Sequence, residues 1–404
     1  MSFLRTISTG RLVAVCASAT ALAAGGTAIA LGAAGGGPVP PAKPLANAVH
    51  DAATAPETQG ITADVKFTNH LIDTSGVHGQ SPLLSGATGR LWFSPQRGLR
   101  LELQSDGNGQ DAQLVASKAG FWAYEPSSNT VYRGAFPADR QEKAGKEQHK
   151  VPSVAQIGRG IGRARQHLVV SGATPTNVAG QPAYSVRVSP GQSGGLLGAV
   201  QLAWDAAHGL PLKIAVYARG NSNPVVELEA TNVSYGAVPD STLAIAPPAG
   251  AHTVDVSPSK GNGGAGDTRA SGRHKGQKLV HGPAAVASKL PFQLSAPNTL
   301  AGRTRTGVTL LNRKGGKAAL VTYGNGPGAI AVFERAAKAG KTAAPSSGRQ
   351  HGKLELPTVS INGATANVLD TPLGSLVSFD RGGVTYTVLG SVHAAVAESA
   401  ARGL

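Results

Sequence analysis

Apolar and polar side chains alternate at every second position in several successive segments, and this pattern constrains the fold most. In one of them, Leu99, Leu101 and Leu103 alternate with Arg100 and Glu102. Successive side chains of a strand point to opposite faces, so a period of two predicts strands that are apolar on one side. Several such segments in succession predict an antiparallel sheet with one dry face and one wet face.

The same pattern places further strands, and two segments have helical spacing instead. Leu45 to Ala55 suits a short amphipathic helix, and Val151 to Gln166 suits a loose helix or lid because glycines interrupt its apolar positions. The predicted strands are Ile61–Ile72, Gly89–Phe93, Gly98–Leu103, Ala112–Ala116, Phe121–Tyr124, Thr130–Phe136, Ala183–Val188, Val200–Asp205, Leu210–Ala218 and Val225–Tyr235.

Composition divides the chain of 404 residues into four parts. We expect a leader and Gly/Pro tether at 1–44, an α+β domain at 45–256, a flexible basic linker at 257–284 and a small α+β domain at 285–404. In the last part, a helix from His393 to Arg402 follows five predicted strands, which are Gly307–Leu311, Ala318–Tyr323, Ala329–Phe333, Leu373–Phe379 and Val384–Gly390.

The N-terminal segment predicts export. No charged residue occurs between Arg11 and Lys43, and Ala28 to Ala30 forms a candidate cleavage site for a secretory signal. Cleaved signal peptide and retained membrane anchor both remain open, and either places the body outside the cytoplasm, secreted or on the outer face of the cytoplasmic membrane. The single cysteine, Cys16, lies in this leader, so the domains have no cysteine for disulfides or zinc.

The positive charge is concentrated in the C-terminal third. Residues 258–404 contain 18 of the 37 basic residues but only 6 of the 22 acidic ones. Such a charge suits anionic lipid headgroups, acidic envelope polymers or an acidic partner protein, and solubility alone is an equal alternative. We expect no nucleic acid partner, because no basic motif rich in aromatics occurs.

The sequence segments that resemble enzyme motifs each lack a residue that the motif requires. The run from Gly158 to Arg163 lacks the third glycine of a dinucleotide turn, and Gly340 to Thr342 lacks the first glycine of a phosphate loop. The 11 histidines are dispersed, and no G-x-S-x-G is present. Glu227 and Glu229 share one face of a strand and are expected to be solvated. We therefore predict no catalytic residues, no metal site, no cofactor and no enzyme activity.

Three segments together resemble the LolA-type lipoprotein carriers. The first runs from Gly89 through Leu103 and contains the Leu-Trp-Phe strand. The second joins Leu114–Ala116 to the Trp122-Ala123-Tyr124-Glu125-Pro126 hairpin, and the third runs from Leu202 to Ala251. One departure is that Ser94-Pro95 replaces the basic residue that usually follows the Leu-Trp strand, which puts the carrier's transfer mechanism in doubt.

The resemblance implies a curved antiparallel half-barrel, capped by helices, that encloses an apolar cavity for acyl chains. Periodicity does not distinguish a cavity from a filled core, so both remain open. The residues expected to line the cavity are Val65, Phe67, Leu91, Phe93, Leu99, Leu101, Leu103, Leu114, Trp122, Tyr124, Ile157, Ile161, Leu212, Ile214 and Val216.

The two-domain layout resembles that of RseB/MucB-type sigma-factor regulators, which bind lipid and an anti-sigma protein. The resemblance implies an exported, non-enzymatic, lipid-binding sensor or regulator of the cell envelope. Its expected partners are a lipid or acyl chain, with a membrane surface or a membrane anti-sigma protein. A lipid or lipoprotein carrier and a structural envelope module without ligand are the alternatives.

Overall fold

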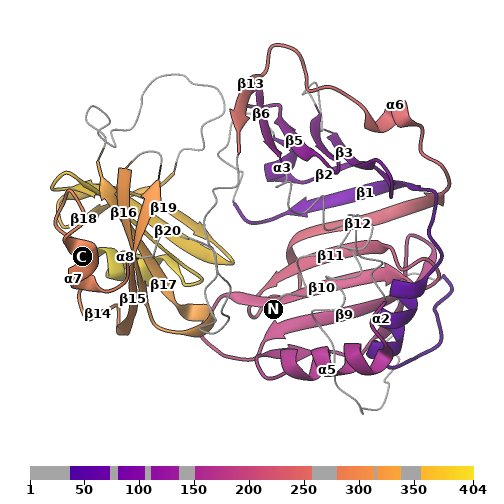
Figure 1. The fold of residues 1–404 in the computed structure, drawn as a ribbon, viewed down its shortest axis with the longest axis horizontal. Helices are drawn as coiled ribbons and strands as arrows, with labels where there is room; N and C mark the ends of the chain where they lie inside the picture. Colours follow the sequence, from indigo (N-terminus) through magenta and orange to yellow (C-terminus); the bar gives the residue numbers. More distant parts are fainter. Residues whose placement is uncertain are drawn as a thin grey trace. The chain divides into compact units, whose positions relative to one another are not determined.

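The structure is a computed structural model that describes residues 37–72, 81–104, 111–135, 151–256, 280–313, 316–337 and 356–404. The predicted leader and most of the predicted linker lie outside these ranges. The chain forms two compact units (Figure 1), each described by itself below. Of the described residues, those between 37 and 191 and between 198 and 256 form the first unit, and residues 192–197 and those from 280 to 404 form the second.

The first unit is built on one 13-stranded sheet with the order β13-β6-β5-β4-β3-β2-β1-β12-β11-β10-β9-β7, and β8 pairs with β9 beside this path. The strands are β1 (Ile61–Asn69), β2 (Ala87–Ser94), β3 (Gly98–Gln104), β4 (Ala112–Ala116), β5 (Gly120–Glu125), β6 (Thr130–Ala135), β7 (Leu168–Val170), β8 (Thr174–Val178), β9 (Gln181–Pro190), β10 (Leu197–Asp205), β11 (Pro211–Ala218), β12 (Pro224–Tyr235) and β13 (His252–Asp255).

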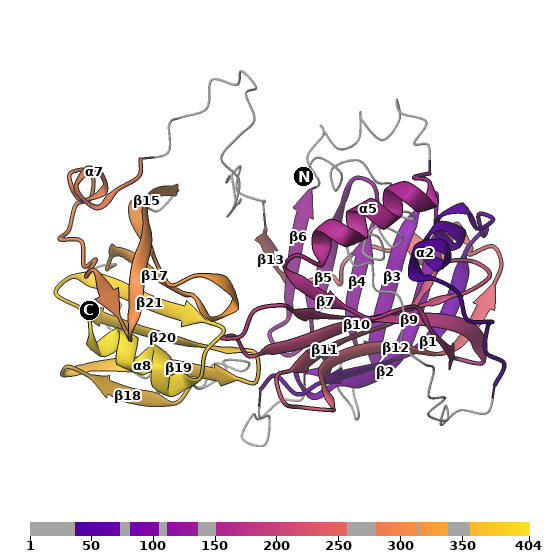
Figure 2. The ribbon, with the colours of Figure 1, turned by 90° about the horizontal axis from the view of Figure 1, so that it is seen from below.

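This sheet is strongly curved, as the two views in Figures 1 and 2 show. The register between β1 and β12 shifts between Asp64 and Val65, and that between β11 and β12 shifts between Val216 and Tyr217. Such bulges bend and twist the strand that carries them. The predicted curved antiparallel architecture is confirmed, with one correction. The edge strand β13 runs parallel to β6, with His252 opposite Thr130.

Two helices pack on the β9 and β10 part of the sheet. They are α2 (Leu45–Thr54) and α5 (Val154–Ala164), and a single apolar cluster joins them to Tyr184 and Trp204. A capping box fixes the start of α5, because the Ser153 hydroxyl accepts from the Gln156 N–H and the Gln156 side chain accepts from the Ser153 N–H. Two single-turn helices, α3 (Pro82–Ser85) and α6 (Asp240–Leu243), complete this unit.

The second unit is an eight-stranded antiparallel sheet with the order β14-β15-β16-β17-β21-β20-β19-β18. Helices α7 and α8 share one apolar core with one face of it. The elements are α7 (Pro283–Ala287), β14 (Thr299–Leu300), β15 (Arg303–Arg313), β16 (Gly316–Tyr323), the 3-10 turn η2 (Gly326–Gly328), β17 (Ile330–Ala336), β18 (Thr358–Ile361), β19 (Ala364–Thr371), β20 (Gly374–Arg381), β21 (Val384–Gly390) and α8 (Ala394–Arg402).

The predicted strands of both units are present, with ends that differ by a few residues. The prediction of five strands in the C-terminal part is wrong, because the structure adds β14, β18 and β19. The strands β7, β8 and β13 of the first unit were also not predicted. These additional strands are mostly short or at a sheet edge, where local patterning carries little signal.

Candidate functional site

A continuous apolar surface crosses the curved sheet of the first unit on one side; we call it the apolar face. Leu101 on β3 lies opposite Leu91 on β2, Leu91 lies opposite Ala63 on β1, and Ala63 lies opposite Val233 on β12. Directly opposed side chains on neighbouring strands share one face of a sheet. Pairs on either side of this row continue the surface in both directions.

Most of the predicted cavity residues lie on the apolar face. Cross-strand pairing places Leu114 opposite Leu101, and Ile214 opposite Leu228, which itself lies opposite Phe67. The predicted residues on this face are Val65, Phe67, Leu91, Phe93, Leu99, Leu101, Leu103, Leu114, Leu212, Ile214 and Val216.

The centre of the apolar face is buried and its margin is not. Val65 and Leu103 are 4% and 2% exposed, whereas Leu91, Leu101 and Leu114 are only half-buried, and Ile214 is 45% exposed. About half of the buried side chains at the centre are small. Of the buried residues in its cluster, Ala63, Ala87, Ala112, Ala183, Ala203 and Ala230 are alanines. The buried centre thus combines these alanines with larger side chains such as Leu103, and half-buried leucines border it.

Four of the predicted cavity residues lie elsewhere. On β5, Ala123 lies opposite Leu114, so the neighbouring Trp122 and Tyr124 point to the other side of the sheet. Ile157 and Ile161 of α5 are buried in the cluster with Tyr184, Val186 and Trp204. Because Tyr184 and Trp204 alternate with Ala183 and Ala203 of the apolar-face cluster, α5 packs on the opposite side of β9 and β10 from that face.

Over β11 and β12, the side of the sheet opposite the apolar face is charged. The Lys213 Nζ atom lies 2.8 Å from the Glu227 carboxylate and 3.1 Å from the Glu229 carboxylate. Burial favours a lower pKa for Lys213, but hydrogen bonds and charge from these two glutamates outweigh burial and raise that pKa. The expectation that the two glutamates are solvated is wrong for Glu227, whose side chain is only 13% exposed, whereas the Glu229 side chain is 32% exposed.

A polar cluster not found from the sequence lies at one end of the apolar face. The Tyr235 hydroxyl donates a hydrogen bond to the Asp205 carboxylate, whose other oxygen accepts from the N–H groups of Ala207 (2.6 Å) and His208 (2.8 Å). Burial and this carboxylate raise the pKa of Tyr235 above its usual range. Gly209 ends the turn at φ +66°, a conformation that glycine adopts easily.

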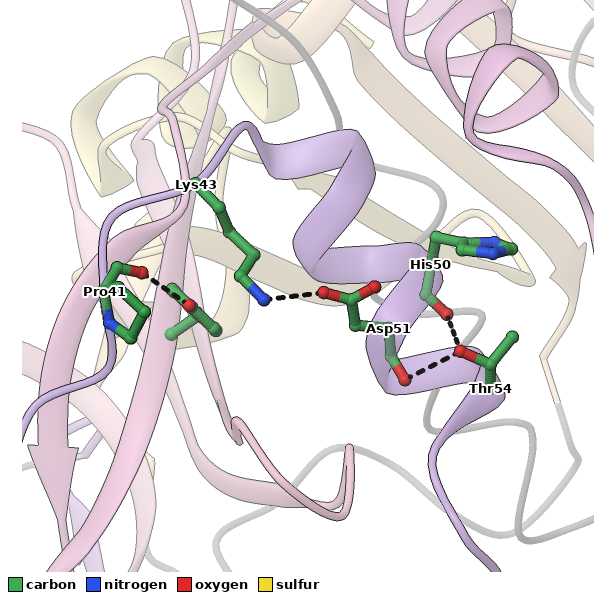
Figure 3. A network of polar contacts seen from close by, with 6 residues as sticks. Pro41, Lys43, His50, Asp51 and Thr54 are labelled. Carbon is green, nitrogen blue, oxygen red and sulfur yellow. Dashed lines mark hydrogen bonds and ion pairs between the residues drawn. The ribbon is translucent and has the colours of Figure 1, made fainter.

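The segment before α2 is anchored by polar contacts (Figure 3). The Tyr184 hydroxyl donates to the carbonyl oxygen of Pro41 at 2.6 Å, and the Lys43 Nζ atom lies 2.6 Å from the Asp51 carboxylate. The hydrogen bond with Asp51 is the main cause that raises the pKa of Lys43. These contacts bind the beginning of the described chain to β9 and to α2.

Metal sites and membrane-spanning helices are two further classes of functional feature. Within the described residues, no three His, Cys, Asp or Glu side chains come together in a way that would hold a metal ion. The described helices include none with the length and apolar character needed to cross a membrane.

Comparison with known proteins reveals resemblance in structure but not in sequence. No protein family model matches the chain, and no curated protein matches it. A crystal structure of MucB in complex with the periplasmic part of MucA is 15% identical, covering 85% of this chain and 91% of that chain with a TM-score of 0.39. The MucA/MucB complex of Pseudomonas aeruginosa is also 15% identical, covering 88% and 94%, with a TM-score of 0.39.

A LolA superfamily protein from Nitrosomonas europaea matches a smaller part. It is 9% identical, and the match covers 48% of this chain and 94% of that chain with a TM-score of 0.21. In the sequence, the strand motifs resemble LolA-type carriers, and the two-domain layout resembles RseB/MucB-type regulators. At these identities the resemblance concerns the fold and does not extend to ligand or partner.

Proposed function

We propose that the first unit binds the acyl chain of a lipid on its apolar face, and that the protein is an exported, non-enzymatic lipid sensor of the cell envelope. The observation that carries this proposal is the half-buried state of Leu91, Leu101 and Leu114 in one continuous row of a sheet. A contiguous apolar surface that remains accessible is typical of a ligand or partner site, because ordinary surfaces expose apolar residues singly.

The energetics suit a hydrocarbon ligand. Each CH₂ group transferred from water contributes about 0.8 kcal/mol, so burying ten of them contributes about 8 kcal/mol before the costs of association. No catalytic residue is needed for such binding. The half-buried margin of the apolar face carries the proposal, since the alanines at the centre are already packed in a buried cluster.

The test begins with the intact protein purified from its own organism. Native mass spectrometry is expected to show a co-purified lipid, and titration with the fluorescent fatty acid cis-parinaric acid is expected to give saturable binding. The paired change Leu91→Thr/Leu101→Thr removes two aliphatic side chains from the apolar face, while threonine still favours a strand. We expect at least a tenfold weaker affinity at this site, about 1.4 kcal/mol.

A matched control is Val169→Thr. Val169 on β7 is 63% exposed and lies away from the apolar-face cluster, so this change removes an aliphatic side chain from the same unit and is expected to leave binding unchanged. An unchanged mass, together with no saturable binding of the fatty acid, would contradict the proposal and favour a structural module without ligand.

We propose sensing rather than carriage as the use of this site, because a carrier needs no second domain. The proposed partner is a membrane anti-sigma protein, and this class comes from the two-domain resemblance of the sequence to RseB/MucB-type regulators. Co-precipitation of the full chain with the membrane anti-sigma protein of its organism, with and without palmitate, tests this use. A palmitate-dependent change in binding supports a sensor, whereas absence of co-precipitation favours a carrier.

A further inference from the structure

The sheet of the second unit has an open cleft on the side away from its core. The cleft has a volume of about 510 Å³. Its floor is one cross-strand row in which Ala331 lies opposite Leu389, Leu389 opposite Leu376, and Leu376 opposite Leu369. Neighbouring strands are about 4.8 Å apart, so this row extends over about 14 Å. We call it the leucine row; Leu373 adds to its wall.

The leucine row is not part of the core of the second unit. Its members alternate along their strands with Val332, Val377 and Val388, each 0% exposed, which pack in the cluster that contains α7 and α8. The leucines of the row are only half-buried. On this side, over which no described helix packs, the sheet therefore offers apolar side chains where solvated polar ones are the rule.

A second hollow of about 280 Å³ lies farther along β17 on the same side. Phe333 and Arg335 help to line it, and they follow Ala331 at intervals of two residues. Arg335 is exposed, and in the described part of the chain its guanidinium has no acidic partner within ion-pair distance. An arginine therefore lies about 13 Å from the end of the leucine row.

The chemistry of the floor favours a hydrocarbon chain over a peptide. Strands β17, β21 and β20 are each paired on both sides, and β19 pairs with β20 along the row and with β18 over Ala364–Asn367. Most backbone N–H and C=O groups of the floor are therefore used within the sheet. A peptide placed on this floor would lose water from its own backbone groups without gaining partners, which is costly. An acyl chain has no such groups and buries only apolar surface.

Charge favours an anionic headgroup on that chain. A guanidinium without a partner binds carboxylates and phosphates through charge-assisted hydrogen bonds. The part of the sequence to which this unit belongs, residues 258–404, carries 18 basic against 6 acidic residues. The positive charge would attract an anionic ligand and repel a cationic one.

We propose that the second unit has its own site for an anionic amphiphile, with the acyl chain on the leucine row and the carboxylate or phosphate at Arg335. This site is separate from the apolar face of the first unit and does not depend on it. The fatty acid and the phospholipid share the required chemistry, and the experiment below distinguishes them.

The test measures the number of ligands bound by the full chain. Native mass spectrometry and calorimetric titration with palmitate are expected to give two bound molecules per chain. The change Leu376→Thr/Leu389→Thr is expected to leave one, and so is Leu91→Thr/Leu101→Thr in the first unit. If the first unit binds no lipid, one palmitate binds and only Leu376→Thr/Leu389→Thr abolishes it. A stoichiometry that Leu376→Thr/Leu389→Thr leaves unchanged would overturn the proposal.

The headgroup is tested with a variant that disturbs no packing. Arg335→Gln is expected to weaken palmitate binding at this site about tenfold and to leave binding of the neutral dodecyl maltoside unchanged. The matched control is Arg402→Gln, which removes the same charge from α8, where Arg402 pairs with Glu398 at 3.0 Å. Equal losses in both variants would contradict a specific role for Arg335. Parallel titrations with palmitate and palmitoyl lysophosphatidylglycerol identify the preferred headgroup by the tighter affinity.

Discussion

The carboxylate of Glu334 on β17 accepts a hydrogen bond from the backbone N–H of Ser295 at 2.9 Å. Glu334 is 0% exposed, and its other oxygen has no hydrogen-bond partner within the described residues. Burial raises the pKa of Glu334 to about 7, although the hydrogen bond from Ser295 lowers it in part. Because this acid is buried in the core of the second unit, its protonation makes the stability of that unit depend on pH.

We expect the second unit to lose stability as pH rises from about 4.5 to about 7. The pKa of Glu334 is 4.5 in the unfolded chain and about 7 in the folded unit, so the folded state holds the proton more tightly. The stabilisation is complete below pH 4.5 and is lost as pH rises through 7, a change of about 3 kcal/mol. Thermal melts of the full chain at several pH values measure it.

The variant Glu334→Gln separates this effect from other titrations. The groups that face Glu334 include Tyr323 and Tyr386, with Arg305 beside Tyr323 and Arg381 beside Tyr386. Burial raises the pKa of both tyrosines, so both stay neutral in this pH range. Glu334→Gln is expected to flatten the dependence, whereas the control Glu398→Gln, at a half-buried glutamate of α8, retains it. An equally steep dependence in Glu334→Gln would contradict the assignment.

Replacing Lys213 by methionine is expected to destabilise the first unit by about 2 kcal/mol. Its ammonium group lies between Glu227 and Glu229, so Lys213→Met leaves two partly buried carboxylates that repel each other on one face of β12. Urea unfolding measures the loss. Adding Glu227→Gln should recover part of it, and additive losses in the double variant would show that Lys213 and Glu227 do not interact.

The sheet architecture was predictable because its signal is local. Leu99, Leu101 and Leu103 alternate with polar residues within a single strand, and the period alone indicates which side chains share a face. The short edge strands β7 and β13 were not predicted, because three or four residues contain too few alternations. Their pairing depends on neighbours that are distant in sequence, such as β9 and β6.

The sequence predicted the candidate site correctly only on strands where the alternating apolar side chains do point to the apolar face. Trp122 and Tyr124 point to the opposite side of the sheet from Leu114. This follows only from the register between β4 and β5, which the sequence does not give. Tertiary packing determines the position of α5. Helical spacing in the sequence indicates that the helix has an apolar stripe but does not indicate which surface that stripe packs against. The leucine row combines residues from four strands, so no local pattern shows it.

The change Ile161→Ala is expected to lower stability without weakening fatty acid binding by the first unit. Ile161 is 0% exposed in the cluster with Trp204, so the truncation should cost about 2–4 kcal/mol. Because α5 packs on the opposite side from the apolar face, the affinity for cis-parinaric acid should stay the same. Leu103→Ala, at a residue 2% exposed on the apolar face, is the control that should change both. Weaker binding in Ile161→Ala would indicate that α5 acts as a lid.

The change Tyr235→Phe is expected to destabilise the first unit by about 2 kcal/mol. The hydroxyl of Tyr235 donates to the carboxylate of Asp205, which is 1% exposed, and hydrogen bonds to charged groups contribute about 1.5–3 kcal/mol. Tyr217→Phe is the matched control, since its hydroxyl donates to the neutral Gln201 amide oxygen at 2.9 Å and should cost only about 1 kcal/mol. Combining Tyr235→Phe with Asp205→Asn measures the coupling in urea unfolding. If the charge of Asp205 is the reason for the difference, Tyr235→Phe should cost less in the Asp205→Asn background, and an equal cost in both backgrounds would contradict it.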